Sequence, residues 1–437
     1  MALVKTLLNG NEVEYDDTEF EILKDEDNSI SYLHYIGNGE AVRNPRGNTS
    51  CYKMFYYCKL KSLDLSNFDT SNVTNMRSMF RDCYKIKVLD LSNFDTSNVT
   101  NMGSMFRHCE SLKELDLSHF DTSNVTIMGA MFYHCYHLIK LDLSNFDTSN
   151  VTSMWAMFHH CYSLIKLDLS NFDTSSVTTM GYMFCCCWSL IELDLSNFDT
   201  SSVTSMENMF EGCKSLKELD LSHFKMSQVE ASSMFNIPKR SSMFKDCQSL
   251  ISLNLSGFDT VISSMFDGCT SLSSLDLSNL SKLYLVPMFL KCNNLENIVF
   301  KRLDILSYSV EDLKFIFEGC PYLDKLLAEK SKRKLLENMV TDLLNQDEKE
   351  VLKKYRDKGI KDHYFVSVLS TVKPKSEMIY DYCDKVIIPN INKLFQKSNG
   401  SSSLTVGDVF KKLSTTYGES LTAIALARFL SDEYLVD

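Results

Sequence analysis

A phrase that recurs at a fixed distance constrains the fold of this chain more than any other feature of its sequence. LDLSNFDTSNVT and close variants of it begin at Leu63, Leu89, Leu115, Leu141, Leu167 and Leu193. Each copy leads into a segment of the form M-x-x-M-F-x-x-C, and the cysteines of these segments recur every 26 residues at Cys83, Cys109, Cys135, Cys161, Cys187 and Cys213. Looser copies surround this array and end at Cys58 on one side and at Cys247, Cys269, Cys292 and Cys320 on the other. Because a unit this short cannot bury a core alone, the repeats must stack on one another.

Stacking turns each apolar position of the repeat into a column of equivalent side chains. Leu115 and Leu117 alternate with a polar residue, which predicts a short strand with one buried face. Two phenylalanine positions recur in the array, one at Phe68, Phe94, Phe120, Phe146, Phe172 and Phe198 and the other at Phe80, Phe106, Phe132, Phe158, Phe184 and Phe210. The sequence therefore predicts a solenoid of about ten to eleven repeats, each about 26 residues long.

The repeat resembles that of the BspA-like leucine-rich repeat proteins, in the subgroup whose repeats read L-D-L-S-N-F-D-T-S-N-V-T-x-M-x-x-M-F-x-x-C. The match extends from about residue 50 to about residue 320, and it is specific because many positions agree in copy after copy. The resemblance implies an α/β solenoid, a curved right-handed stack with a strand on one face and a short helix or turn on the other. It also implies a binding or adhesive role, commonly at the surface of bacteria or protists.

The repeat pattern divides the chain into three predicted parts. Residues 1–58 are expected to form an N-terminal cap and a divergent first repeat, because an uncovered layer of phenylalanine and leucine would aggregate. Residues 59–322 form the predicted solenoid, with an irregular insertion at 225–243 where the cysteine spacing widens from 26 to 34. Residues 323–437 are expected to form an all-helical domain, beginning with one helix over 323–358 whose leucines recur at helical spacing.

The composition argues against several functional classes. A net charge of -12 lacks the basic footprint of a nucleic-acid-binding protein. The apolar runs are too short for membrane insertion, and the N-terminal run is too short for an export signal, so we expect a cytoplasmic location. The family resemblance leaves surface display or secretion by a non-classical route as the alternative. No phosphate-binding loop or nucleophile elbow occurs, so the sequence predicts neither an enzyme nor a cofactor.

Eleven of the 15 cysteines occupy one repeat position beside a phenylalanine. We expect them to be buried and reduced, as small apolar side chains. The residue before this cysteine varies among copies, and His134, His160 and Cys186 are of types that bind zinc. Evenly stacked ligands form a line and not a tetrahedron. The sequence therefore predicts no metal site, with these three residues as weak candidates.

The residue between the two leucines of each strand forms an acidic column. It consists of Asp64, Asp90, Asp116, Asp142, Asp168, Asp194 and Asp220, and Asn254 and Asp276 continue it. On an expected concave face, carboxylates about 5 Å apart repel one another by roughly 1 kcal/mol per pair in water. Hydrogen bonds from the serine two residues on, such as Ser66, would offset this repulsion. A basic partner or bound cations such as calcium are the functional alternatives.

The central repeats carry an aromatic patch. It consists of Tyr133, Tyr136, Trp155, Tyr162, Tyr182 and Trp188, together with Ile139, Ile165 and Ile191 at a position where flanking copies have lysine. Tryptophan and tyrosine are favoured as anchors at protein interfaces, and a contiguous apolar patch is typical of a binding surface. The alternative is that some of these rings fold back onto their own coil.

These observations predict a non-enzymatic protein-binding scaffold for recognition or adhesion. Its partner would be a protein, which could be basic, and a homodimer that buries the patch symmetrically is a further option. One alternative is an effector or toxin-like protein, with activity in the C-terminal helical domain and target recognition by the repeats. Another is a purely structural protein that associates with itself.

Overall fold

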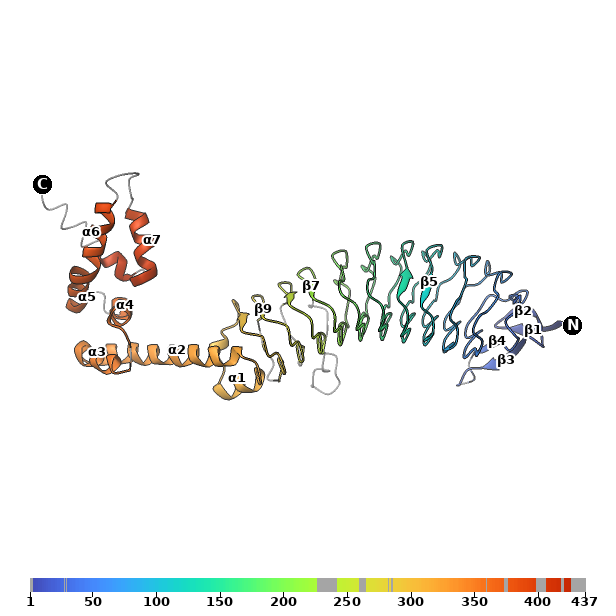
Figure 1. Ribbon diagram of the computed structural model, residues 1–437, viewed down its shortest axis with the longest axis horizontal. Helices are drawn as coiled ribbons and strands as arrows, with labels where there is room; N and C mark the ends of the chain where they lie inside the picture. Colours follow the sequence, from blue (N-terminus) through green and yellow to red (C-terminus); the bar gives the residue numbers. More distant parts are fainter. Residues whose placement is uncertain are drawn as a thin grey trace. The chain divides into compact units, whose positions relative to one another are not determined.

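The computed structural model describes residues 3–26, 28, 30–225, 242–258, 265–281, 283, 286–358, 360–372, 376–397, 406–417 and 420–425. The chain forms two compact units, Met1–Leu326 and Leu327–Asp437. In the first unit, coils of chain stack side by side into a curved array (Figure 1). The first unit is therefore a repeat solenoid, as the periodic sequence predicts.

Two β-hairpins form the N-terminal end of the solenoid. Strands β1 (Leu3–Leu8) and β2 (Asn11–Asp16) pair antiparallel, as do β3 (Phe20–Lys24) and β4 (Ser31–Tyr35). Asn9 and Gly10 join the first pair with φ angles of 52° and 88°, the conformation that a two-residue hairpin turn requires. The ring of Tyr35 lies 5.3 Å from that of Phe55, so the second hairpin covers the end of a phenylalanine column.

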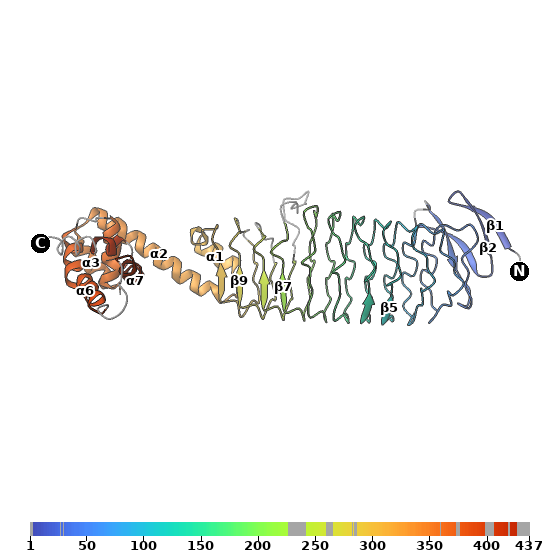
Figure 2. The same cartoon turned by 90° about the horizontal axis from the view of Figure 1, so that it is seen from above.

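One side of the coils carries short parallel strands, which Figure 2 shows along one edge of the stack. They are β5 (Glu114–Asp116), β6 (Lys140–Asp142), β7 (Glu218–Asp220), β8 (Ser252–Asn254), β9 (Ser274–Asp276) and β10 (Asn297–Val299). Neighbouring strands pair in register, with Leu115 opposite Leu141 and Leu219 opposite Leu253. The leucines therefore face the core together, and the acidic residues between them form one row.

The other side of each coil is a run of tight turns. The N–H groups of Ala130 and His134 donate to the next coil, at the carbonyls of Trp155 (2.7 Å) and His159 (2.8 Å). The intervening Tyr133 instead donates within its own coil, to the carbonyl of Ala130 at 3.2 Å. Because alternate N–H groups leave the coil, an α-helical ladder cannot form. Among the described residues 49–299 the structure has strands and turns but no helix, so α/β does not describe the repeats.

A left-handed residue precedes the core cysteine in every coil. The positions are Tyr57, Asp82, His108, His134, His160, Cys186, Gly212, Asp246, Gly268, Lys291 and Gly319, with φ between 59° and 80°. This conformation is unfavourable for most side chains, whereas glycine adopts it freely and aspartate and histidine are enriched in it. Backbone geometry alone therefore accounts for much of the variation at this position, including its histidines.

Two columns of side chains fill the turn side of the core. The rings of Phe55, Phe80, Phe106, Phe132, Phe158, Phe184, Phe210, Phe244, Phe266, Phe289 and Phe317 stack with successive centroids 5.1–5.9 Å apart. Beside them, the core cysteines from Cys83 onward each donate their thiol to a carbonyl of the preceding coil, as Cys135 does to Phe106 at 3.2 Å. These thiols are free and buried, and burial raises the pKa of Cys161 to about 12. At neutral pH the cysteine column is therefore uncharged.

Polar side chains tie neighbouring coils together where the chain turns. Thr122, which is buried, donates its hydroxyl to the backbone carbonyl of Asp147 in the next coil at 2.8 Å. Asn124 donates its side-chain amide to the carbonyl of Ser97 in the preceding coil at 2.8 Å. The same bonds recur from coil to coil at equivalent positions, so groups that the turns leave without backbone partners are satisfied.

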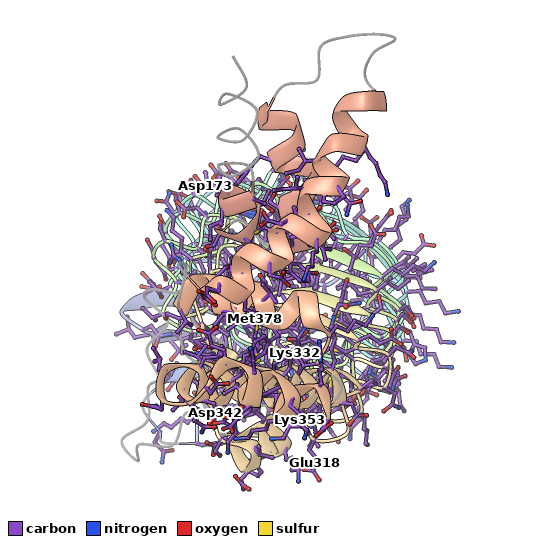
Figure 3. All side chains as sticks on the ribbon, turned by 90° about the vertical axis from the view of Figure 1, so that its left-hand side faces the viewer. Asp173, Glu318, Lys332, Asp342, Lys353 and Met378 are labelled. Atoms are coloured by element: carbon purple, nitrogen blue, oxygen red, sulfur yellow. The ribbon has the colours of Figure 1, made fainter. Side chains whose placement is uncertain are left out.

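Helices follow the last coils. They are η1 (Ile305–Ser307), α1 (Val310–Ile316), α2 (Tyr322–Asn345), α3 (Glu348–Arg356), α4 (Asp362–Val372), α5 (Glu377–Tyr382), the π-helical segment η2 (Cys383–Ile387), α6 (Ile388–Lys397) and α7 (Val406–Tyr417). The helix predicted over 323–358 is interrupted, because Asp347 accepts from the N–H groups of Lys349 and Glu350 and caps α3. Asp342 of α2, labelled in Figure 3, accepts from the Tyr355 hydroxyl of α3 at 3.0 Å.

The predicted insertion at 225–243 lies largely outside the described residues. Of the helices that the structure does describe, none combines the length and the apolar character that crossing a bilayer requires.

The phenylalanine columns supply a direct test of stacking. Phe146 is 2% exposed and stacks on Phe172, and Leu280 occupies the equivalent position in a later coil. We expect Phe146→Ala to lower the free energy of unfolding by about 3–5 kcal/mol. Phe146→Leu, which copies the later coil, should cost less than about 1.5 kcal/mol. Urea denaturation of both variants checks this, and equal losses would show that the column is not tightly packed.

Candidate functional site

Three aromatic rings of the predicted patch form one stacked column on the surface. Tyr136 stacks on Tyr162 with centroids 4.9 Å apart, and Tyr162 stacks on Trp188 at 3.9 Å. Lys214 continues the column, with its ammonium group 4.0 Å from the centre of the Trp188 ring. The rings come from the position after the core cysteine in successive coils, so coil stacking alone brings them together. Trp188 remains 37% exposed, and its outer surface is free to contact a partner.

A row of isoleucines borders an open groove beside this column. Ile139, Ile165 and Ile191 are 41–49% exposed. Together with serines of the same coils they line a groove of about 640 Å³, whose members are Ile139, Ser163, Ile165, Ser189, Ile191, Ser215, Lys217 and Ser249. The groove is lined by small serine side chains and by the exposed, apolar isoleucines. Such a concave apolar surface can receive protruding side chains of another molecule.

The remaining patch residues cluster around histidines. Tyr133 stacks on His134 at 4.1 Å, and its ring accepts the guanidinium of Arg107 at 4.4 Å. Tyr182 lies 5.6 Å from the His159 ring and 6.2 Å from that of Trp155. The tyrosines are half-buried and Trp155 is 40% exposed. These rings therefore pack partly on side chains of their own and neighbouring coils, and Trp155 presents the most accessible surface among them.

Contacts of the rings join the two aromatic groups into one surface. His134 bridges them, because its ring lies 4.1 Å from that of Tyr133 and 5.0 Å from that of Tyr136. The Tyr136 hydroxyl also lies 2.7 Å from Nδ1 of His134. Two cations that sequence reasoning missed, Arg107 and Lys214, cover rings of the patch. The register of the repeat could have revealed Lys214, since it stands one period after Trp188.

The weak metal candidates lie close together. His160 and Cys186 form a compact group with His159, in which one donor atom of each residue lies within 4.8 Å of the others. His134 lies outside this group, although its ring centroid is 4.4 Å from that of His160. Burial lowers the pKa of both His134 and His159 to about 3. Both imidazoles are therefore neutral at pH 7.

The acidic column lies on the strand side, and its carboxylates are held by turn hydrogen bonds. The hydroxyl and N–H of Ser66 donate to Asp64 at 2.7 and 3.1 Å, and they lower the pKa of that carboxyl. The N–H and hydroxyl of Ser196 likewise lower the pKa of Asp194, although neighbouring Asp168 acts in the opposite direction. The net direction for Asp194 is downward, so hydrogen bonding outweighs repulsion at that carboxyl.

The acidic column and the isoleucine row lie on the same coils. Each isoleucine stands three residues before an acidic residue, as Ile165 does before Asp168. A mixed row separates them, in which Lys166 forms an ion pair with Glu192 of the next coil. The central coils thus carry an apolar row, a mixed row and an acidic row in sequence order.

Family models match the stacked coils. A model described as "Mycoplasma protein of unknown function, DUF285" matches residues 49–166 and 137–240. A model described as a BspA type leucine rich repeat region of six copies matches residues 239–340. No protein with a curated description matches the chain.

Several solved structures are similar to parts of this chain. A leucine-rich repeat protein from Bacteroides ovatus is 16% identical with a TM-score of 0.31, over 71% of this chain and 93% of its own. A leucine rich cell surface protein from Faecalibacterium prausnitzii is 17% identical with a TM-score of 0.30, over 69% and 97%. The functional domain of InlJ from Listeria monocytogenes, which includes a cysteine ladder, is 16% identical with a TM-score of 0.21, over 61% and 56%. At these scores none of the three informs the site.

Acid should destabilise the solenoid through its aspartates. Because the pKa values of aspartates such as Asp64, Asp168 and Asp194 are lower in the folded chain, their contribution is present above the ordinary value near 4 and is lost as pH falls through the folded values. We expect the urea midpoint to fall between pH 5 and pH 3. Asp194→Asn should reduce this pH dependence, since Asn254 already accepts the equivalent bond from Ser256 in a later coil. A midpoint that rises on acidification would show that repulsion dominates.

Proposed function

By its repeats this chain belongs to the BspA-like leucine-rich repeat proteins, and we propose that it is a non-enzymatic protein-binding scaffold. The single observation that carries the proposal is the exposed apolar face of the coils that contain Tyr136, Tyr162 and Trp188. Flanking coils place Glu110 and Lys214 in the column of these rings, and Lys113 and Lys217 in the isoleucine row. The fold thus accepts charged residues at these positions, so packing within the solenoid does not account for the apolar ones.

The partner that fits this face is a protein with apolar side chains beside basic ones. Its apolar side chains would enter the groove along Ile165 and Ile191, where burial of exposed apolar surface contributes about 25 cal/mol per Å². Its lysine or arginine side chains would face the acidic row at Asp168 and Asp194, which lies alongside. Attraction to that row would set the orientation and the rate of association more than the affinity.

The finer organisation of the chain is part of the proposal. We take residues 1–58 as the cap, residues 59–322 as a solenoid of ten to eleven repeats, and residues 323–437 as a helical domain. A left-handed residue before the core cysteine at eleven positions supports the repeat number. The compact unit Leu327–Asp437, whose described elements are helices, supports a separate domain.

Exchanging patch residues for those of flanking coils tests the proposal without disturbing the core. Trp188→Lys copies Lys214, Tyr162→Glu copies Glu110, and Ile165→Lys copies Lys217. We expect the triple variant to keep its free energy of unfolding in urea to within about 1 kcal/mol, because surface changes away from special features have small effects. In the native host, we expect a specific protein to cross-link to the unaltered chain but not to the triple variant, as measured by quantitative mass spectrometry.

The matched control is Val88→Glu. Val88 is exposed and apolar but lies outside the patch, and the equivalent residue of the next coil is Glu114. This variant should retain the cross-linked protein. Light scattering of the unaltered and triple-variant chains separates self-association from binding of another protein. Identical cross-linking profiles for the triple variant and the control, with no change in molecular mass, would contradict a role for this face.

A further inference from the structure

The cluster of His159, His160 and Cys186 has the composition and spacing of a metal site. The two histidines are adjacent in one coil, and the cysteine follows in the next coil at the position equivalent to His160. One donor atom from each residue lies within 4.8 Å of the other two. Because the donors come from two columns and two coils, they form a triangle and not the line that stacking of one column would produce.

The donors are oriented by neighbouring groups. The Tyr162 hydroxyl lies 2.7 Å from Nδ1 of His160, which fixes that ring and leaves its Nε2 available. Nδ1 of His159 is buried and makes no hydrogen bond within the part of the chain that the structure describes. A buried ring nitrogen without a partner is one that a ligand would satisfy.

The sulfur atom also has a distinctive setting. The Cys186 sulfur is only half-buried and accepts from the Cys185 thiol at 3.8 Å. Cys161 and Cys187 of the core column are instead buried, and their thiols donate to backbone carbonyls. Among these cysteines, Cys186 is therefore the one whose sulfur is accessible to a metal ion.

From this geometry we infer that His159, His160 and Cys186 bind a zinc ion. Zinc takes nitrogen ligands at about 2.0–2.1 Å and thiolate sulfur at about 2.3 Å in a tetrahedral arrangement. Donor atoms around such an ion are about 3.3–3.7 Å apart, so modest side-chain rotation closes the present triangle on the metal. All three residues are only half-buried, which lets an ion enter and leaves a fourth position for water or another ligand.

Titration of the full-length, reduced and chelator-treated chain with Zn²⁺ and, separately, with Co²⁺ tests the inference. We expect a single tight equivalent of Zn²⁺, and a Co²⁺ complex with the absorption of a thiolate ligand. Cys186→Gly should abolish that absorption and weaken Zn²⁺ binding at least about tenfold. Glycine already occupies this left-handed position at Gly212, so the substitution suits the backbone. His159→Arg, which copies Arg107, should weaken binding by a similar factor.

The matched control is His119→Asn. His119 donates from Nε2 to the carbonyl of Leu91, and Asn93 and Asn171 supply the equivalent side chain in other coils. This variant removes a histidine while preserving the fold, and it should bind Zn²⁺ as the unaltered chain does. Circular dichroism confirms that each variant is folded. The inference is wrong if the unaltered chain binds Zn²⁺ no more tightly than the Cys186→Gly variant, or if Co²⁺ binds without thiolate absorption.

Discussion

Hydrogen bonds between neighbouring coils are the interaction on which the rest of this structure depends. On the turn side, alternate N–H groups donate to the next coil, and a left-handed residue before each core cysteine repeats the same turn. On the strand side, in-register pairing sets Leu115 opposite Leu141. These bonds hold equivalent residues at equivalent places. Each phenylalanine of the column therefore stacks on that of the preceding coil, and core thiols donate to equivalent carbonyls. A core that no single repeat could bury thus becomes continuous.

Because successive coils are in register, equivalent surface residues also form rows. The row that contains Tyr162 and Trp188 carries charged residues in flanking coils. The fold therefore does not require aromatic rings at this position, and their presence marks the proposed binding face. Coil stacking by itself brings rings of neighbouring coils into contact, as the 3.9 Å separation of the Tyr162 and Trp188 ring centroids shows. The fold therefore supplies preorganised anchors at little conformational cost, which favours a binding role.

The architecture was largely predictable because near-identical copies can be compared by eye. Repeat stacking, the leucine and phenylalanine columns and the family follow from residue identity at a fixed period. The turn side was less predictable, since the spacing in M-x-x-M-F-x-x-C suits a helical turn as well as a chain of tight turns. Only the direction of the N–H groups of residues such as Ala130 distinguishes the two. The break before α3 was missed because the leucines keep their spacing across Asp347, whose cap is a local hydrogen bond.

The sequence predicted which residues of the candidate site share a repeat position, but not which side chains of different positions meet. Tyr136, Tyr162 and Trp188 share a column, and sequence reasoning found them together. That His159, His160 and Cys186 bring their donor atoms within 4.8 Å of one another depends on side-chain rotamers, which residue identity at a fixed period does not set. Which rings stay exposed also depends on packing, as Trp155 and the half-buried Tyr182 show.

Deletion of one period tests the register most directly. Removing residues 115–140 joins Glu114 to Leu141 and leaves every column intact but one coil shorter. If stacking in register is the basis of the fold, this variant gives an unchanged circular dichroism spectrum per residue and a cooperative urea transition. Removing only residues 115–127, half a period, should abolish that transition, because the half-coil that remains at the junction cannot pair with both of its neighbours. Equal behaviour of the two deletions would contradict the account.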